Sequence, residues 1–273
     1  MNTRNFLLAG HDAGEVLFKN FKGLPTIAEY KRKETNIGDW TIKPFNLGGV
    51  QGYFTNGSEM GTGIALLKNS TTWMSITPME LESHLLPNSL ASGTTVIAGL
   101  GLGMITLSLL KNPRVDKLIV LEIDQDLIDS FPELIEGESL ANWNQNIESG
   151  RLEVIQADCL KPLKPEVLSK VRNCDYMWVD VWETLFTNEG LEITQALQRQ
   201  VKSKVVDFWG MELEFIKQMS TFSNRFSEKH LYKAVQSFNL PLSPLKFTGK
   251  RKALYAEICM RAGVLVAKTS TTK

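Results

Sequence analysis

The sequence predicts an α/β protein in which a small β-rich region, residues 1–90, precedes a doubly wound, mostly parallel sheet formed by residues 91–273. From Thr94 onward, apolar segments typical of strands alternate with helical segments, and continuous runs such as LIVLEI fit burial on both faces of a sheet. Before residue 90, short runs rich in Thr, Tyr, Phe and Trp are separated by Gly-Gly, Asn-Gly and Gly-Thr-Gly turn signals.

The composition favours an ordinary soluble, cytoplasmic protein. Hydrophobic residues make up 43% and charged residues 22% of 273 residues, and the formal net charge is zero, so no basic field predicts nucleic-acid binding. FLLAG near the start is too short for a signal-peptide core, and the uncharged stretch 94–110 is too short and glycine-rich to span a membrane. Cys159, Cys174 and Cys259 lack metal-like spacing, so we expect reduced thiols and no metal site.

The elements follow in order along the chain. Strands are expected within residues 40–76, and a helix over 77–90, where Thr77 is the candidate N-cap, Pro78 takes the first helical position and Glu80 lies at capping-box distance. In the second region, strands are expected at 94–99, 117–123, 151–158, 175–182 and about 205–208, with helices at 103–112, 124–135, 165–173 and 189–203. Pro132 is expected to interrupt or restart the second of these helices, and the tail 267–273 to be disordered.

A glycine loop follows the first strand of the second region. Gly99, Gly101 and Gly103 give the spacing G-x-G-x-G, whereas the dinucleotide fingerprint G-x-G-x-x-G would require a glycine at Met104. Glu122 ends the next strand, close to the spacing at which a carboxylate accepts hydrogen bonds from both ribose hydroxyls. Loop, acidic strand end and βαβ frame together indicate a nucleoside site.

Asp158 ends the third strand in the same way. Its carboxylate suits the amino group of an adenine, and the alternative is that it caps the turn that follows.

Four segments, VIAGLGLG, LIVLEID, VIQADC and DYMWVDVWE, occur in the order of the cofactor motifs of class I S-adenosylmethionine-dependent methyltransferases. Over residues 60–215 the chain resembles the spermidine synthase-like branch, whose members have a β-rich N-terminal domain before a Rossmann-like domain and are often dimers. The resemblance implies S-adenosylmethionine as cofactor and a possible homodimer. It implies a binding site in which Gly99, Gly101 and Gly103 line the methionine part, Glu122 holds the ribose, Ile123, Asp158 and Cys159 surround the adenine, and Asp180 lies at the mouth of the acceptor pocket.

The chain departs from spermidine synthases in two places. Their glycine loop carries an Asp that binds the amine of the decarboxylated cofactor, and Gly101 stands there in this sequence. Their tyrosine-containing segment corresponds to PMELESHLL, which has no tyrosine. Asp180 and Glu183 keep the separation of the paired catalytic carboxylates, with Glu in place of the second Asp. These departures favour methyl transfer over aminopropyl transfer.

Methyl transfer needs an aligned acceptor and, in some cases, a base. Asp180 and Glu183 are the candidates for binding a cationic amine and removing its proton, and His84 is a candidate second base with a structural role as the alternative. Trp178, Asp180 and Trp182 would share one strand face, so Trp182 would wall the acceptor, unless the tryptophans belong to the core. Trp209, together with Asp207 and Glu212, would shape the acceptor pocket or simply pack.

Three functions therefore remain open. The first is a methyltransferase acting on a small molecule, possibly an amine. The second is an aminopropyltransferase of the polyamine type, and the third is a non-catalytic cofactor-binding module.

Overall fold

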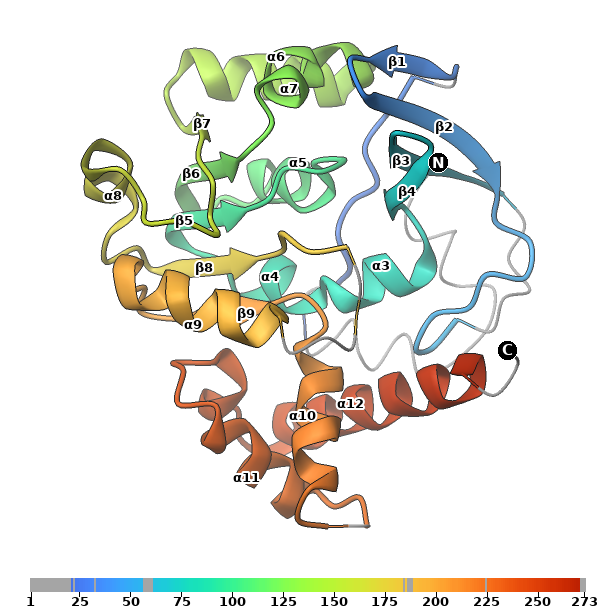
Figure 1. Cartoon of the computed structure of the whole chain (residues 1–273), viewed down its shortest axis with the longest axis vertical. Helices are drawn as coiled ribbons and strands as arrows, with labels where there is room; N and C mark the ends of the chain where they lie inside the picture. Colours follow the sequence, from blue (N-terminus) through green and yellow to red (C-terminus); the bar gives the residue numbers. More distant parts are fainter. Residues whose placement is uncertain are drawn as a thin grey trace.

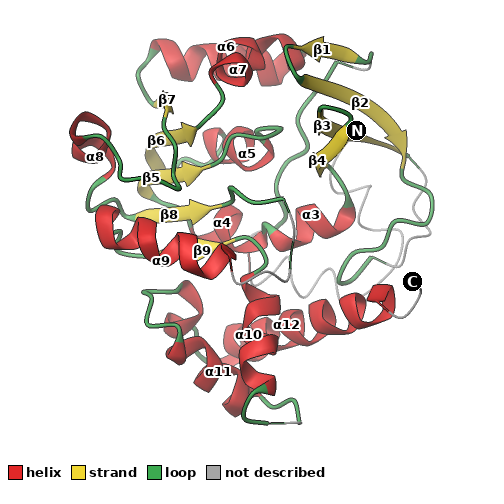
Figure 2. Ribbon diagram, viewed as in Figure 1, coloured by secondary structure: helices red, strands yellow, loops and turns green. Residues whose placement is uncertain are grey.

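The computed structural model describes residues 21, 23–31, 33–55, 61–183, 185, 189–223 and 225–270. It contains a four-stranded sheet of order β1-β2-β3-β4 and a five-stranded sheet of order β7-β6-β5-β8-β9, which lie beside each other in Figures 1 and 2. The predicted α/β class, a Rossmann-like parallel sheet preceded by a β-rich region, is confirmed. The N-terminal segment FLLAG lies outside the described residues.

The N-terminal sheet is an antiparallel meander. Its strands are β1 (Thr35–Ile37), β2 (Trp40–Asn46), β3 (Thr62–Lys68) and β4 (Thr71–Ser75). The β3–β4 turn is made by Asn69 and Ser70, both with positive φ, as the tight turns that suit twisted hairpins require. The sequence prediction relied on glycine signals and did not use this turn, because Ser seldom adopts positive φ.

The predicted helix over 77–90 is two short helices, α3 (Pro78–Ser83) and α4 (Leu85–Leu90), which meet at His84. The Oγ1 of Thr77 accepts the N–H of Glu80, which confirms Thr77 as N-cap. The capping-box prediction for Glu80 is wrong. Its buried carboxylate is directed toward His84 and Trp209, because a charged group placed inside the protein takes the polar partners that it finds there.

All five strands of the second sheet are parallel, and the strand order reverses between β5 and β8. The strands are β5 (Gly93–Ala98), β6 (Val115–Glu122), β7 (Leu152–Gln156), β8 (Tyr176–Val179) and β9 (Val206–Phe208). The connecting helices are α5 (Met104–Leu110), α6 (Gln125–Leu134), α7 (Gly137–Glu148), α8 (Pro165–Val171) and α9 (Glu189–Val201). From β5 the chain builds the sheet outward first through β6 and β7 and then through β8 and β9. Because crossovers between parallel strands are right-handed, this order places helices on both faces of the sheet.

Beyond β9 the chain is helical, with α10 (Met211–Ser220), α11 (Glu228–Ser237), the 3₁₀ helix η1 (Ser243–Lys246) and α12 (Gly249–Ser270) forming the layer at the bottom of Figure 1. The sequence prediction did not include α7, α10, α11 or α12. Helix α12 buries Tyr255, Ile258, Cys259 and Ala262 at helical spacing, against α10 and α11.

Two sequence predictions need correction here. Pro132 lies inside α6, which runs on to Leu134 without interruption. The tail was expected to be disordered, but α12 continues through Ser270, and the last three residues lie outside the described part of the chain. Among the described helices, none combines the length and apolar character that a membrane crossing requires.

Candidate functional site

A cavity of about 270 Å³ lies at the carboxyl ends of the parallel strands, where the strand order reverses. Gly99 follows β5, Glu122 ends β6, Asp158 follows β7 and Asp180 follows β8, and all four line the cavity. Open α/β sheets bind ligands at this position because the loops of neighbouring strands diverge there. The N-terminal sheet closes the other side with Trp40, Lys68, Trp73 and Met74.

The glycine loop needs glycine at two positions for different reasons. Gly99 has φ +99°, and a Cβ there would lie 2.0 Å from the carbonyl oxygen of Asp180. Gly101 has φ +49°, and a Cβ there would lie 2.4 Å from the Sδ of Met74. The loop can therefore approach both the end of β8 and the N-terminal sheet only because Gly99 and Gly101 carry no side chain. Both glycines line the cavity.

The N-terminal region also holds the loop by hydrogen bonds. The N–H of Leu102 donates to the Sδ of Met74 at 3.0 Å, and the carbonyl oxygen of Leu102 accepts from the hydroxyl of Tyr30 at 2.8 Å. The N–H and the carbonyl oxygen of Leu102 are thus both satisfied by side chains of the N-terminal region.

Gly103 is not among the residues that line the cavity. It precedes α5 with φ +65°, and a Cβ there would lie 2.3 Å from the ring of Phe131 in α6. The geometry gives Gly103 a packing position between two helices, next to the loop that the sequence assigned to the cofactor.

Glu122 is buried and lines the cavity. Its Oε2 accepts the N–H of Leu100 at 2.9 Å and its Oε1 accepts the N–H of Asp124 at 3.0 Å. These bonds fix the carboxylate against the glycine loop. Each oxygen keeps a second lone pair, so the group can still accept hydrogen bonds from two adjacent hydroxyls.

Ile123 and Leu160 stand at the mouth of the same cavity with 55% and 60% of their surface exposed. Asp158 and Cys159 also line it. The Oδ1 of Asp158 accepts the N–H of Leu160 at 3.0 Å and its Oδ2 pairs with Lys161 at 2.8 Å, so Asp158 does cap the following turn. Burial raises the pKa of the Cys159 thiol to about 12, which keeps it neutral. Exposed aliphatic side chains beside a cavity suit the faces of a flat ring.

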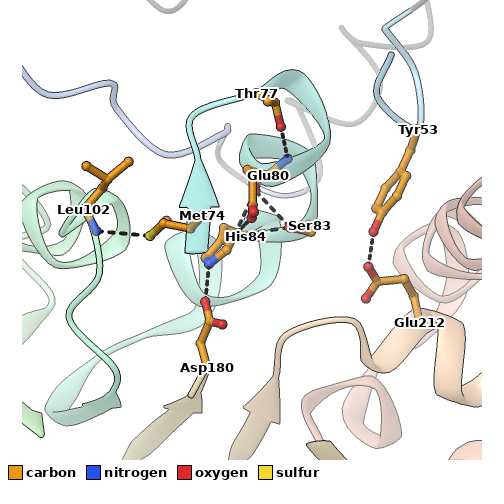
Figure 3. A network of polar contacts seen from close by, with 9 residues as sticks. All are labelled: Tyr53, Met74, Thr77, Glu80, Ser83, His84, Leu102, Asp180 and Glu212. Carbon is orange, nitrogen blue, oxygen red and sulfur yellow. Dashed lines mark hydrogen bonds and ion pairs between the residues drawn. The ribbon is translucent and has the colours of Figure 1, made fainter. Parts of the chain in front are cut away.

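At the inner end of the cavity, His84 joins two acidic residues (Figure 3). Its Nε2 lies 3.1 Å from the Oδ2 of Asp180. Its Nδ1 lies 2.8 Å from the carbonyl oxygen of Glu80 and 3.9 Å from the Oε2 of the same residue. The side chain of Trp209 is close to the Glu80 carboxyl and lowers its pKa. Glu80, His84, Asp180 and Trp209 all line the cavity.

The charges of this group are set by burial and by one another. Burial raises the pKa of Glu80 to about 8, against the lowering effect of His84, and the charges of Asp180 and Glu212 raise it further. Burial lowers the pKa of His84, but the hydrogen bond and charge of Asp180 and the charge of Glu80 outweigh it, so this pKa is raised overall.

The aromatic side chains divide into two groups. Trp182 and Trp209, predicted to contact the acceptor, line the cavity together with Trp73, which the sequence did not single out. Trp178 does not line it, and its buried ring packs against His84 with centroids 5.1 Å apart. The strand ends at Val179, before the alternation that would have placed Trp178 and Asp180 on one face.

Three further acidic residues of the sequence analysis lie away from the cavity. Glu183 is exposed and does not line it. Buried Asp207 accepts from the hydroxyl of Tyr176 and the N–H of Ser243, both at 2.9 Å, so it anchors β9. Buried Glu212 accepts the hydroxyl of Tyr53.

The carboxylate that accompanies Asp180 at the cavity is therefore Glu80, which sequence reasoning had assigned to a helix cap. The available signal was the segment PMELESHLL, whose Glu80 and Glu82 are both buried. Among the described residues, no three His, Cys, Asp or Glu side chains are grouped as a metal site.

Comparison with known proteins gives fold neighbours only. No family model matches the chain, and no curated protein matches it. Among solved structures, it is similar to spermidine synthase from Thermotoga maritima, with 18% identity and a TM-score of 0.36 over 65% of this chain and 54% of that one. A spermidine synthase in complex with the transition-state analogue AdoDATO has 17% identity and a TM-score of 0.38, over 66% and 58% of the two chains.

The [4+2]-cyclase SpnF has 11% identity and a TM-score of 0.33, over 85% of this chain and 73% of its own. The chain thus spans little more than half the length of the two spermidine synthases. Because all three TM-scores lie below 0.5, the Rossmann-like assignment rests on the strand order and not on these likenesses.

Proposed function

We propose that the chain is an S-adenosylmethionine-dependent transferase that methylates a small-molecule acceptor. One observation carries the proposal: a single cavity joins a nucleoside-type end, formed by Gly99, Gly101 and Glu122, to an acidic end formed by Glu80 and Asp180. A cofactor and a second substrate need such adjacent sites because their reacting atoms must meet.

The nucleoside end fits the cofactor in three respects. Glu122 has spare acceptor capacity for the ribose hydroxyls, as described above. Ile123 and Leu160 expose aliphatic surface that an adenine ring would cover. Gly99 and Gly101 leave room beside the backbone for the methionine part.

When bound, the sulfonium cofactor supplies a methyl carbon whose bond to sulfur breaks as the acceptor's electron pair bonds to it, leaving a neutral thioether. The chain's own residues have simpler tasks. Trp73, Trp182 and Trp209 wall the cavity and exclude water. Glu80 and Asp180 attract a positively charged acceptor and offer oxygens for its proton.

Aminopropyl transfer remains the second candidate because of one specific finding. The glycine loop lacks the carboxylate of spermidine synthases, but Glu80 and Asp180 line the same cavity as Gly101. The missing loop residue is therefore weaker evidence against aminopropyl transfer than the sequence indicated.

The proposal is tested by calorimetry with S-adenosylmethionine, its decarboxylated form and S-adenosylhomocysteine, followed by mass spectrometry of acceptor-dependent products. We expect the intact cofactor to bind and a product heavier by one methyl group to form. Tighter binding of the decarboxylated form with an aminopropyl product would select the second candidate, and binding without any product would select a non-catalytic module.

A pair of variants tests the ribose assignment. Glu122→Ala should weaken cofactor binding at least tenfold, since charge-assisted hydrogen bonds are lost. Glu133→Ala, a change at an exposed glutamate of α6 outside the cavity, is the control and should bind as the unmodified protein does. Equal affinity of the two variants, both folded, would refute the ribose assignment.

A further inference from the structure

We propose that Glu80, and not His84, accepts the proton of a cationic amine acceptor whose nitrogen binds between Glu80 and Asp180. The inference rests on the proposed transferase function and names the acceptor class and the base.

The charges along the cavity favour a cation over an anion. The described residues that line it include four carboxylates: Glu80, Glu122, Asp158 and Asp180. Lys68 is the only lysine or arginine among them, and its Nζ pairs with Asp124 at 3.2 Å and lies 4.7 Å from the ring centre of Trp40. Among the described residues that line the cavity, an anionic acceptor would therefore find no lysine or arginine that is not already paired with a carboxylate.

Two of the four carboxylates already have partners of their own. Glu122 accepts two backbone N–H groups, and Asp158 pairs with Lys161 on the protein surface. Glu80 and Asp180 share a single cation, His84, between them. An ammonium group placed between these two carboxylates would balance the remaining charge, and the indole of Trp209 would lie next to it.

His84 is badly placed to act as the base. Its Nε2 faces a carboxylate oxygen of Asp180, and its Nδ1 faces the carbonyl oxygen of Glu80. The nearby hydroxyl of Ser83 already donates to that same carbonyl. Because both ring nitrogens face acceptors, both carry protons, and neither has a lone pair for a substrate proton. His84 is thus a positioning residue that holds Asp180 and neutralises part of the charge.

Glu80 has the properties that a base for amines needs. Its carboxylate lines the cavity, and among the described residues its ion-pair partner is His84, at 3.9 Å. Burial raises its pKa to about 8, whereas an alkylamine has a pKa of about 10. The titratable groups that face it are His84, Asp180 and Glu212, with Tyr53 behind Glu212. The N–H proton passes to a Glu80 oxygen, and the freed nitrogen electron pair bonds to the carbon that the sulfonium would supply, as the bond from that carbon to sulfur breaks and the sulfur leaves as a neutral thioether.

The experiment supplies the cofactor form that binds, together with a panel of small alkyl- and arylamines, each matched by the corresponding alcohol and carboxylic acid. Transfer products are measured by mass spectrometry from pH 6 to 9.5. We expect amine products only, with kcat rising as Glu80 ionises. Glu80→Gln should lower kcat about 100-fold or more and remove this rise, and Glu80→Asp should restore part of both.

Glu82→Gln is the matched control, because Glu82 is a buried carboxylate of the same helix that does not line this cavity. It should keep the pH profile of the unmodified protein, and His84→Gln should keep the rise in kcat with pH while lowering kcat. Cofactor binding serves as the test that each variant is folded.

Three results would overturn the inference: an unchanged pH profile in Glu80→Gln, preferred reaction of alcohols or acids, or no amine product from a protein that binds cofactor. Failure of the unmodified protein to bind any form of the cofactor would instead overturn the proposed function.

Discussion

The Nε2 of His84 lies 3.1 Å from the Oδ2 of Asp180, although the two residues are 96 positions apart in the sequence. His84 stands between α3 and α4, on the segment that leaves the N-terminal sheet, whereas Asp180 follows β8 of the parallel sheet. This contact makes the inner end of the cavity a joint product of both parts of the chain.

Substitution of His84 should lower the free energy of unfolding, and the size of this loss should depend on whether Asp180 is present. At pH 6.5 Glu80, with its pKa of about 8, is mostly protonated, so His84→Gln chiefly leaves the Asp180 carboxylate without its cationic partner, and we expect a loss of about 3 kcal/mol in the free energy of unfolding. A double-mutant cycle with Asp180→Asn, measured by urea unfolding at pH 6.5, should give a coupling of at least about 1 kcal/mol. Additive effects of the two substitutions would show that the contact contributes nothing.

Stability should fall as the pH rises from about 5 to 8. Glu80 has a pKa of about 8 in the folded chain and an ordinary value of 4.5, so between these values the folded state holds a proton that the unfolded state has lost. His84, whose pKa is also raised, acts in the same direction, because its contribution is lost as the pH passes its folded pKa.

Glu80 alone should account for up to about 1.4 kcal/mol per pH unit in this window. Urea unfolding at pH 5.5, 6.5 and 7.5 measures the slope, and Glu80→Gln should flatten it. A variant with the slope of the unmodified protein would mean that Glu80 titrates normally.

The exposed aliphatic pair at the cavity mouth should matter for binding and not for folding. Ile123→Ser and Leu160→Ser should each weaken S-adenosylhomocysteine binding roughly three- to tenfold, since covered apolar surface is lost. The unfolding free energy should change by less than about 0.5 kcal/mol. Ile147→Ser is the control, because Ile147 is 42% exposed and lies outside the cavity. Equal binding by all three variants would place the adenine elsewhere.

Gly99→Ala should destabilise the chain by more than about 3 kcal/mol, because the new methyl group would lie 2.0 Å from a backbone carbonyl that cannot move alone. Gly49→Ala is the control that distinguishes backbone strain from a steric clash. Gly49 has φ +84° with no atom within 4 Å of the added Cβ, so only the conformational cost of roughly 1 kcal/mol is expected. Similar losses in both variants, by thermal or urea unfolding, would contradict the close approach of Gly99 to Asp180.

The sequence was informative where local patterns determine local structure. Alternating apolar strands and helices predicted the parallel sheet, and a strand end is a reliable place for a ligand side chain, so Glu122, Asp158 and Asp180 were placed on one edge. It failed where a side chain's role depends on a distant partner. Glu80 has the spacing of a capping residue, and only the approach of Asp180, which follows β8, and Trp209, which follows β9, turns it into a cavity residue.

Glu183 illustrates the opposite error. Its separation from Asp180 matches a catalytic pair, but β8 ends at Val179, and the chain direction after a strand cannot be read from spacing. Helix α7 was missed because a helix with buried Ser139, Trp143 and Asn146 has a weak apolar stripe.

The two hydrogen bonds that Met74 and Tyr30 make to Leu102 have a thermodynamic consequence. Since Met74 and Tyr30 satisfy the amide and the carbonyl of this loop residue, the loop keeps its shape only while the N-terminal region stays docked. Any ligand that binds preferentially to the ordered loop must therefore also shift the equilibrium of that region toward its docked state, by linkage. Hydrogen exchange of the Leu102 amide tests this, because its exchange with solvent deuterium requires the hydrogen bond to Met74 to open. A bound ligand should slow exchange at this amide as much as it slows exchange at the amides of the parallel strands.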